Sequence, residues 1–149
     1  MYKQFKAFKR ISAVLVLLAY SSGPAFALPQ TPEVVSGSAQ IHVDQNIMTI
    51  NASENAILNY SSFNINANES VIFNLPSADS RILNRVTGNG VSDLLGTLIS
   101  NGLFILINPN GIYIGPQARI QANNLIMSTR QISNQDFLDA KYLFEKSGP

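Results

Sequence analysis

Short apolar segments alternate with polar, turn-forming residues from Ala39 to near the end of the chain. The apolar segments are three to five residues long, and separators such as "DQN", "NANES", "TGNG" and "NPNG" are rich in Asn, Gly, Ser and Pro. Strands of this length at regular spacing are typical of all-β sandwiches, barrels and solenoids. We predict strands at residues 40–43, 47–50, 56–59, 62–65, 71–75, 82–86, 103–107, 112–114, 119–121 and 125–128.

Two kinds of strand can be distinguished by their pattern. The segments "QIHV" (40–43) and "RIQA" (119–122) alternate, as strands with one solvent-exposed face do. By contrast, "LFILI" (103–107) is apolar throughout, which indicates a strand covered on both faces and is more common in parallel sheets. The 16 Asn after residue 27 suit the corners of a coil, where Asn side chains can also stack into ladders. This combination favours a β-solenoid, with a sandwich as the alternative because no exact repeat length is visible.

One segment near the carboxyl end has the pattern of a helix. Ser133 is followed three residues later by an aspartate, which is a capping-box start, and it predicts a short helix at residues 134–140. Phe137, Leu138 and Tyr142 would form its apolar face. The alternative is a polar loop with apolar residues by chance.

The first 27 residues contain the three parts of a secretory signal peptide in order. A basic segment, "MYKQFKAFKR", precedes the apolar run "ISAVLVLLA", and Ala25-Phe26-Ala27 follows as an A-x-A cleavage site. A membrane anchor is the alternative, but a span needs about 20 apolar residues and this run is interrupted by "SSGP". We predict cleavage between Ala27 and Leu28, so that residues 28–149 form the mature domain.

Removal of the leader changes the charge of the chain. Four of the ten Lys and Arg lie in the leader and none of the nine Asp and Glu do, so six against nine leaves a net charge of −3. A chain with this balance offers no basic surface for nucleic acid. The chain has no cysteine, so an exported domain of this kind must be stable without disulfides.

No group of residues has the spacing of a catalytic or metal site. The one histidine, His42, lies in an alternating strand without acidic or sulfur partners at ligand spacing, which favours a surface position. Asp44, Asp79 and Asp93 are isolated in sequence, whereas polysaccharide-cleaving solenoids need clustered carboxylates. We therefore predict no enzymatic activity, no metal and no cofactor.

The segment "NPNG" at residues 108–111 is explained by local turn chemistry. Pro109 fixes φ at the second position of a type I turn, and Gly111 supplies conformational freedom at the fourth. Asn108 can accept a hydrogen bond from the backbone two residues further on, as an Asx-turn. The same chemistry predicts turns at "TGNG" (87–90) and "SNG" (100–102).

Several short motifs, each unspecific alone, follow one another in a particular order. They are "SFNI" (62–65), "NRVTG" (84–88), "LG" (95–96), "NG" (101–102), "INPNGIYIG" (107–115) and "STRQISNQDF" (128–137). In this order and at this spacing the chain resembles the amino-terminal secretion domain of filamentous-haemagglutinin-like exoproteins of two-partner secretion. The resemblance covers about residues 40–144, nearly all of the predicted mature chain.

The resemblance implies a fold and a set of functional residues. The implied fold is all-β, a right-handed parallel β-helix (solenoid) with an amino-terminal cap and extra hairpins, to which the pattern above adds one short helix. The secretion motif would be Asn108, Pro109, Asn110, Gly111 and Ile112. A second family motif would form a turn at Asn84, Arg85, Val86, Thr87 and Gly88. An earlier Asn-rich motif found in some members is not assigned, since that region here reads "NYSSFNINAN".

The resemblance also implies partners and a location. An outer-membrane β-barrel transporter with periplasmic docking domains would recognise the domain in the periplasm, after the inner-membrane secretion machinery has exported it, and start its export and β-helix folding. The domain would then be extracellular or on the cell surface, as a monomer and at the start of a longer exoprotein. The alternative function is an adhesin or glycan-binding β-solenoid that does not depend on a dedicated transporter.

Overall fold

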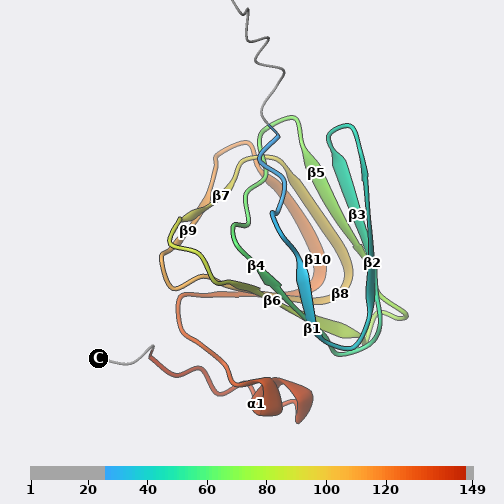
Figure 1. The fold of residues 1–149 in the computed structure, drawn as a ribbon, viewed down its shortest axis with the longest axis vertical. Helices are drawn as coiled ribbons and strands as arrows, with labels where there is room; N and C mark the ends of the chain where they lie inside the picture. The colour runs from blue at the N-terminus through green and yellow to red at the C-terminus, as the bar shows by residue number, and fades with distance from the viewer. Residues whose placement is uncertain (1–25, 147–149) are drawn as a thin grey trace, which may run out of the picture.

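The computed structural model describes residues 26–146, so most of the predicted signal peptide lies outside the described residues. Strands dominate this part of the chain, and Figure 1 shows them arranged around a common interior. None of the helices in residues 26–146 is long and apolar enough to cross a bilayer. The elements are β1 (Glu33–Ser36), β2 (Ala39–Asp44), β3 (Ile47–Ala52), β4 (Ala56–Tyr60), β5 (Ser70–Asn74), β6 (Arg81–Val86), β7 (Ser92–Leu94), β8 (Thr97–Ile107), β9 (Ile112–Ile114), β10 (Arg119–Ser128) and α1 (Asn134–Leu138).

The strands stack in parallel ladders, as the successive coils of a solenoid do. The first ladder joins β3, β5 and the first halves of β8 and β10. The second ladder joins β4, β6 and the second halves of β8 and β10. A short third ladder pairs β7 with β9. Ile65 of the preceding coil extends this ladder by a parallel bridge to Leu94. The parallel β-helix implied by the resemblance is therefore confirmed.

Antiparallel pairings cap the first coil at its amino-terminal side. β2 and β3 form a hairpin in which Ala39 pairs with Ala52 and Asp44 pairs with Ile47. β1 runs antiparallel to β4, and Gln30 forms an antiparallel bridge with the segment after β4. These pairings occupy the edges of β3 and β4 that would otherwise be open, and open strand edges are sites of unwanted association.

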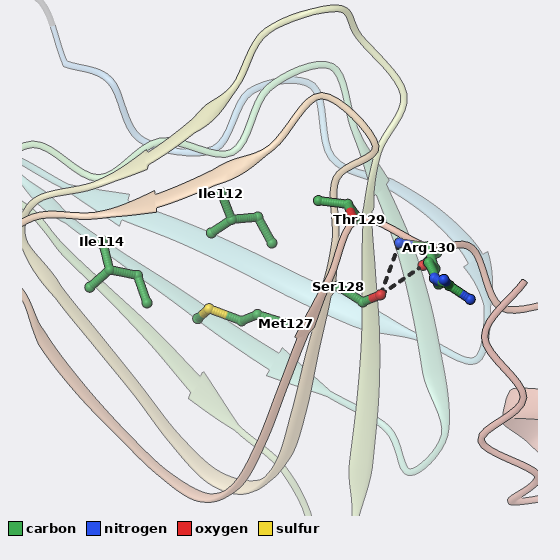
Figure 2. Close-up of a pocket in the computed structure, with 6 residues that line it drawn as sticks. All are labelled: Ile112, Ile114, Met127, Ser128, Thr129 and Arg130. Atoms are coloured by element: carbon green, nitrogen blue, oxygen red, sulfur yellow. Dashed lines mark hydrogen bonds between the residues drawn. The ribbon is translucent and has the colours of Figure 1, made fainter. Parts of the chain in front are cut away.

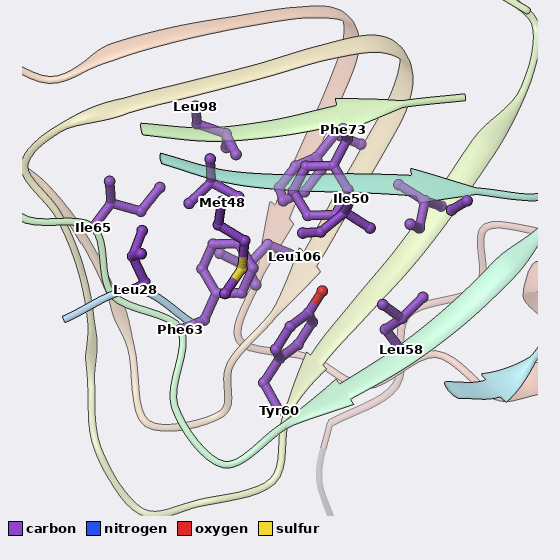
Figure 3. Close-up of a cluster of buried hydrophobic side chains, with 14 of the residues drawn as sticks. Leu28, Met48, Ile50, Leu58, Tyr60, Phe63, Ile65, Phe73, Leu98 and Leu106 are labelled. Atoms are coloured by element: carbon purple, nitrogen blue, oxygen red, sulfur yellow. The ribbon is translucent and has the colours of Figure 1, made fainter. Parts of the chain in front are cut away.

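Alternate residues of each strand point into the coils and form the main core. Tyr60, Phe63, Phe73 and Phe104 are fully buried there. Figure 3 shows the rings of Tyr60, Phe63 and Phe73 among aliphatic side chains. The Phe73 and Phe104 ring centroids are 4.9 Å apart, and those of Tyr60 and Phe63 are 5.1 Å apart at 89°. Aromatic pairs of this geometry contribute about 0.5–1.5 kcal/mol beyond the burial of their area.

A second apolar cluster lies on the outer side of the second ladder. Ile57, Leu83 and Ile105 point outward from β4, β6 and β8, and all three are fully buried. The segment after β10 covers them, with Phe137 of α1 at the centre, and α1 lies outside the coils in Figure 1. This cover explains why "LFILI" is apolar throughout, and the prediction of a strand buried on both faces is confirmed.

The structure corrects several predicted elements. Residues 62–65 form isolated bridges rather than a strand, while β1 and β7 were not predicted. The "SNG" at 100–102 is not a turn, because β8 continues through it from the first ladder into the second. Residues 119–121 and 125–128 likewise belong to one strand, β10, with a register shift between its halves.

The helix forms with the predicted cap but is shorter than predicted. The Ser133 hydroxyl accepts a hydrogen bond from the Asp136 amide at 3.0 Å, and α1 ends at Leu138 instead of Ala140. Phe137 is fully buried, whereas Leu138 and Tyr142 are about two-fifths exposed. The predicted apolar face is therefore wrong for two of its three residues.

Candidate functional site

The turn at residues 108–111 has the local geometry that its residues predict. The Gly111 amide donates to the Asn108 carbonyl at 3.1 Å, and the Asn110 amide donates to Asn108 Oδ1 at 3.0 Å, which is the expected Asx-turn. Gly111 adopts φ +118°, a conformation that side-chain-bearing residues rarely take. The turn connects β8 to β9, and so leads from the second face of the solenoid to the third.

Asn108 is fully buried and joins this turn to the preceding coil. Its Nδ2 donates to the Gly90 carbonyl at 3.0 Å and to Ser92 Oγ at 2.9 Å, both in the corner below. Its own amide donates to the Ser128 carbonyl in the following coil at 3.0 Å. Asn108 therefore connects three successive coils at one corner of the solenoid.

Among the other residues of the motif, Asn110 and Ile112 contact the rest of the fold, and Pro109 is exposed. Asn110 Nδ2 donates to the Gly88 carbonyl at 2.8 Å, which adds a second side-chain bond to the same preceding corner. Ile112 packs its half-buried side chain against the main core. Pro109 is exposed, and its ring, which has no hydrogen-bonding group, fixes φ at the second position of the turn.

The "NRVTG" motif lies directly below in the preceding coil, but only its last two residues form a turn. Asn84, Arg85 and Val86 belong to β6, because this part of the motif continues the second ladder. Thr87 starts the turn, and its amide and hydroxyl both donate to the Tyr60 carbonyl, at 2.8 and 3.1 Å. The motif thus attaches its coil to the one before it.

Gly88 is needed because of a close approach between backbones. A Cβ at this position would lie 2.1 Å from the Ser61 carbonyl oxygen, a distance that real contacts do not show. Gly90, two residues further on, has nothing within 4 Å of the corresponding position. The first glycine of "TGNG" is therefore fixed by packing, and the second is not.

Asn84 lies inside the coils and connects three of them. It is fully buried, its Oδ1 accepts from the Tyr60 hydroxyl at 3.2 Å, and its Nδ2 donates to the Ile105 carbonyl at 3.2 Å. Burial raises the pKa of Tyr60, which keeps its hydroxyl protonated as the donor of this bond. A buried polar network of this kind is stable because both of its side chains are paired.

Arg85 points in the opposite direction and holds the segment after β10 against the solenoid. Its guanidinium donates to Asn134 Oδ1 at 2.5 Å and to the Ile132 carbonyl. Partial burial lowers the pKa of Arg85. The "NRVTG" and "ISN" motifs, which are far apart in sequence, therefore meet through this side chain.

Arg81, which precedes Arg85 in β6, supports the same segment. Its guanidinium lies 5.6 Å from the centre of the Phe137 ring, and it donates to the Leu138 carbonyl at 3.1 Å. Cation–π contact and a forked donor are both properties of Arg that Lys does not share equally. Arg81 was not predicted as a functional residue, although it lies just before the "NRVTG" motif in the sequence.

Two open hollows adjoin the exposed side of the 108–111 turn. The first, of about 390 Å³, is shown in Figure 2 between β9 and the end of β10, where the Ser128 hydroxyl bonds the Arg130 backbone. The second, of about 350 Å³, has Pro109 in its wall. Both share Thr129 and Arg130. We call Pro109, Thr129, Arg130 and Ile112 the corner surface.

The corner surface lacks the groups of a catalytic site. The titratable side chains in the walls of the two hollows are those of Arg130 and Lys146, and neither wall contains a carboxylate or a histidine. Within residues 26–146, no three His, Cys, Asp or Glu side chains gather as metal ligands. His42 is exposed on β2, as expected from the sequence. The predicted cleavage residues Ala27 and Leu28 lie at the opposite, amino-terminal side, where Leu28 enters the main core.

Comparison with known proteins identifies the family. The TPS (two-partner secretion) domain model matches residues 24–148. Two heme/hemopexin-binding proteins of Haemophilus influenzae are 36% and 31% identical, over 79% and 89% of this chain but only 14% and 15% of their own length. The crystal structure of the HMW1 secretion domain from Haemophilus influenzae superposes with a TM-score of 0.78 at 44% identity, covering 80% of this chain and 32% of that chain. The chain thus spans about a seventh of the curated relatives it matches, and it belongs to the two-partner secretion domain family.

Proposed function

We propose that this domain is recognised in the periplasm by an outer-membrane β-barrel transporter with periplasmic docking domains, and that this recognition starts export. Membership of the family establishes targeting by two-partner secretion, which is not an enzymatic role, and implies an outer-membrane transporter in general. The place and manner of recognition are the proposal. In it, the leader takes the chain through the inner-membrane machinery and is cleaved between Ala27 and Leu28.

The residues of the 108–111 turn have two different environments, and this difference is the main support for the proposal. Asn108 and Asn110 direct side-chain amides to the preceding corner, so the fold uses both. Pro109 is exposed at the edge of a hollow that it shares with Thr129, Arg130 and Lys146. An exposed proline that the turn holds in a fixed conformation is available to be recognised by a partner, so we assign recognition to the corner surface.

Strand addition is the proposed mode of the first contact with the transporter. β1 and β2 each pair on one side only within residues 26–146, and both have exposed residues. An extended segment can join the edge of a partner's sheet through backbone hydrogen bonds, with side chains providing specificity. An incompletely folded chain would offer these segments before the cap forms.

Folding outside the cell would then retain the exported chain. Stacking of the coils buries the aromatic core, and each large apolar side chain contributes about 1.5–3 kcal/mol when it is fully buried. Return through the transporter would require the loss of this stabilisation. We further propose that the domain precedes a longer exoprotein, as its length relative to the curated relatives suggests.

A reporter fusion tests the proposed function. A reporter is joined after Pro149 and expressed in cells with and without the cognate transporter, and the reporter in the medium is measured. We expect release only in the presence of the transporter. Equal release, or equal retention of intact fusion in the periplasm, in both strains would contradict transporter recognition by this domain.

A further inference from the structure

Glu69 has a buried carboxylate at the amino-terminal side of the solenoid. The residue is 1% exposed and lies in the turn before β5. Its Oε1 accepts from the Ala27 amide at 2.7 Å, and its Oε2 accepts from the Asn66 amide at 2.7 Å. The ion pair recorded in residues 26–146 joins Lys141 to Asp139, so no described cation neutralises Glu69.

A buried carboxylate is stabilised further when one of its donors is a cation. Removing an ionised carboxylate from water is costly unless the charge is paired and hydrogen-bonded. Each carboxylate oxygen can accept two hydrogen bonds, so Glu69 retains acceptor capacity beside the Ala27 amide. The geometry therefore suits a cationic donor at the place where the Ala27 amide now lies.

The predicted cleavage site lies at this place. Leu28 is 3% exposed, and Figure 3 shows its side chain beside Phe63 and Ile65 in the main core. Hydrolysis of the Ala27–Leu28 peptide bond consumes one water, releases Ala27 with a carboxylate and leaves Leu28 with a protonated amino group. Adjacent Cα atoms are about 3.8 Å apart, so this ammonium would form within one residue of the donor that now contacts Glu69.

We propose that Glu69 is the binding site for the α-ammonium group of Leu28, which removal of the signal peptide creates. The ammonium takes the position of the Ala27 amide, and a hydrogen bond from a neutral donor becomes an ion pair beside the core. Anchoring of Leu28 then completes the cap over the first coil. The inference rests on the cleavage between Ala27 and Leu28 that the proposed function includes, and it does not depend on recognition by the transporter.

The burial of this segment also sets an order of events. Leu28 and Pro29 are both buried, so the Ala27–Leu28 bond is not available to a peptidase once the cap is folded. Peptidases cleave exposed or locally unfolded segments. Cleavage must therefore come before the cap closes, and only the cleaved chain can form the ion pair.

A two-by-two comparison tests the binding site. Chains of residues 28–149 are prepared with a free or an acetylated Leu28 amine, each with Glu69 or with Glu69→Gln, and their denaturant unfolding is measured. We expect acetylation to lower the folding equilibrium constant about tenfold with Glu69 and less than about twofold with Gln at this position, as for a partly buried ion pair. The exposed Glu54 provides the matched control, and the tenfold effect should persist in Glu54→Gln.

Equal effects of acetylation with Glu and with Gln at position 69 would overturn the proposal. If Glu69→Gln does not fold, acetylation of the unsubstituted chain is still a test. An unchanged stability after acetylation would exclude an ion pair at Leu28. Mass spectrometry of the exported protein gives an independent test. A first residue other than Leu28 would place the ammonium elsewhere and overturn the proposal, whereas Leu28 supports it.

Discussion

The two turns that flank β9 both have a proline at their second position but differ in how they are attached to the rest of the molecule. The turn at residues 108–111 is joined to the preceding corner by the side-chain amides of Asn108 and Asn110. The turn at residues 115–118 is held by backbone bonds, with the Gly115 amide donating to the Leu94 carbonyl at 2.9 Å. Each turn contains Gly and an exposed Pro, so turn composition alone does not distinguish them.

The difference shows how a turn can have two roles in this fold. In the first turn, the buried amide of Asn108 aligns successive coils, and this alignment leaves Pro109 in one defined exposed position. In the second turn, the Gly115 amide bonds the preceding coil through the backbone alone, and the chain changes direction before β10. We infer that substitutions in the first turn can separate the stacking of coils by Asn108 from the recognition of Pro109 by the transporter. We expect no recognition role for the second turn.

Substitution of Asn108 should have the largest effect on stability. Asn108→Ala leaves the buried Ser92 hydroxyl without its partner, and an unsatisfied buried group costs roughly 1–3 kcal/mol. The substitution also removes the part-buried bonds to the Gly90 carbonyl and from the Asn110 amide. We expect a loss of about 3 kcal/mol in the free energy of unfolding, measured by denaturant titration. Asn89→Ala is the control, because Asn89 is exposed in the preceding corner, and an equal loss there would contradict the role of Asn108.

Gly88→Ala should come next, because it adds a methyl group where two corners touch. The new Cβ would lie 2.1 Å from the Ser61 carbonyl oxygen, so the backbone must shift. We expect a loss of about 2 kcal/mol, within the range for overpacking. Gly90→Ala, which meets nothing within 4 Å, should change stability much less, and similar values for both variants would show that the corners do not pack as described.

Arg85→Ala should release the segment that covers the outer apolar cluster, without unstacking the coils. The substitution removes the bonds to Asn134 and to the Ile132 carbonyl, and we expect a loss of about 1–2 kcal/mol. Hydrogen exchange should become faster at the paired amides of Gln131 and Glu145. Unchanged exchange there would contradict this role, and the exposed Arg119 provides the control substitution, Arg119→Ala.

Pro109→Ala and Pro116→Ala should have the smallest effects on stability. Both prolines are exposed in turns, and replacing such a proline changes the free energy of unfolding by less than about 1 kcal/mol, chiefly through the unfolded state. Thermal unfolding of the two variants should therefore agree closely. A large loss in Pro109→Ala alone would mean that Pro109 is also required for the fold.

Local chemistry was sufficient to predict some of these features from the sequence. The Asx-turn at Asn108, the cap at Ser133 and the double burial of "LFILI" depend on neighbouring residues or on the apolar pattern, and all three are confirmed. The parallel β-helix followed from the resemblance, because the apolar pattern alone also allowed a sandwich.

Other features depend on contacts between coils, which no local pattern specifies. Arg85 meets Ile132 across 47 residues, and Ala27 meets Glu69 across 42. The "SNG" segment was wrongly predicted as a turn because Asn101 bonds the Leu75 backbone in the preceding coil, which lets β8 continue through it. In each case the partner is adjacent only after the chain has completed a coil.

Export of the two proline variants tests the central claim most directly. The reporter is fused after Pro149 of the Pro109→Ala and Pro116→Ala chains, and its transporter-dependent release to the medium is compared with that of the unsubstituted chain. We expect Pro109→Ala to lose export while Pro116→Ala retains it, with both domains equally stable. Equal export of both variants would contradict recognition at Pro109 and leave the 108–111 turn with a role in folding alone.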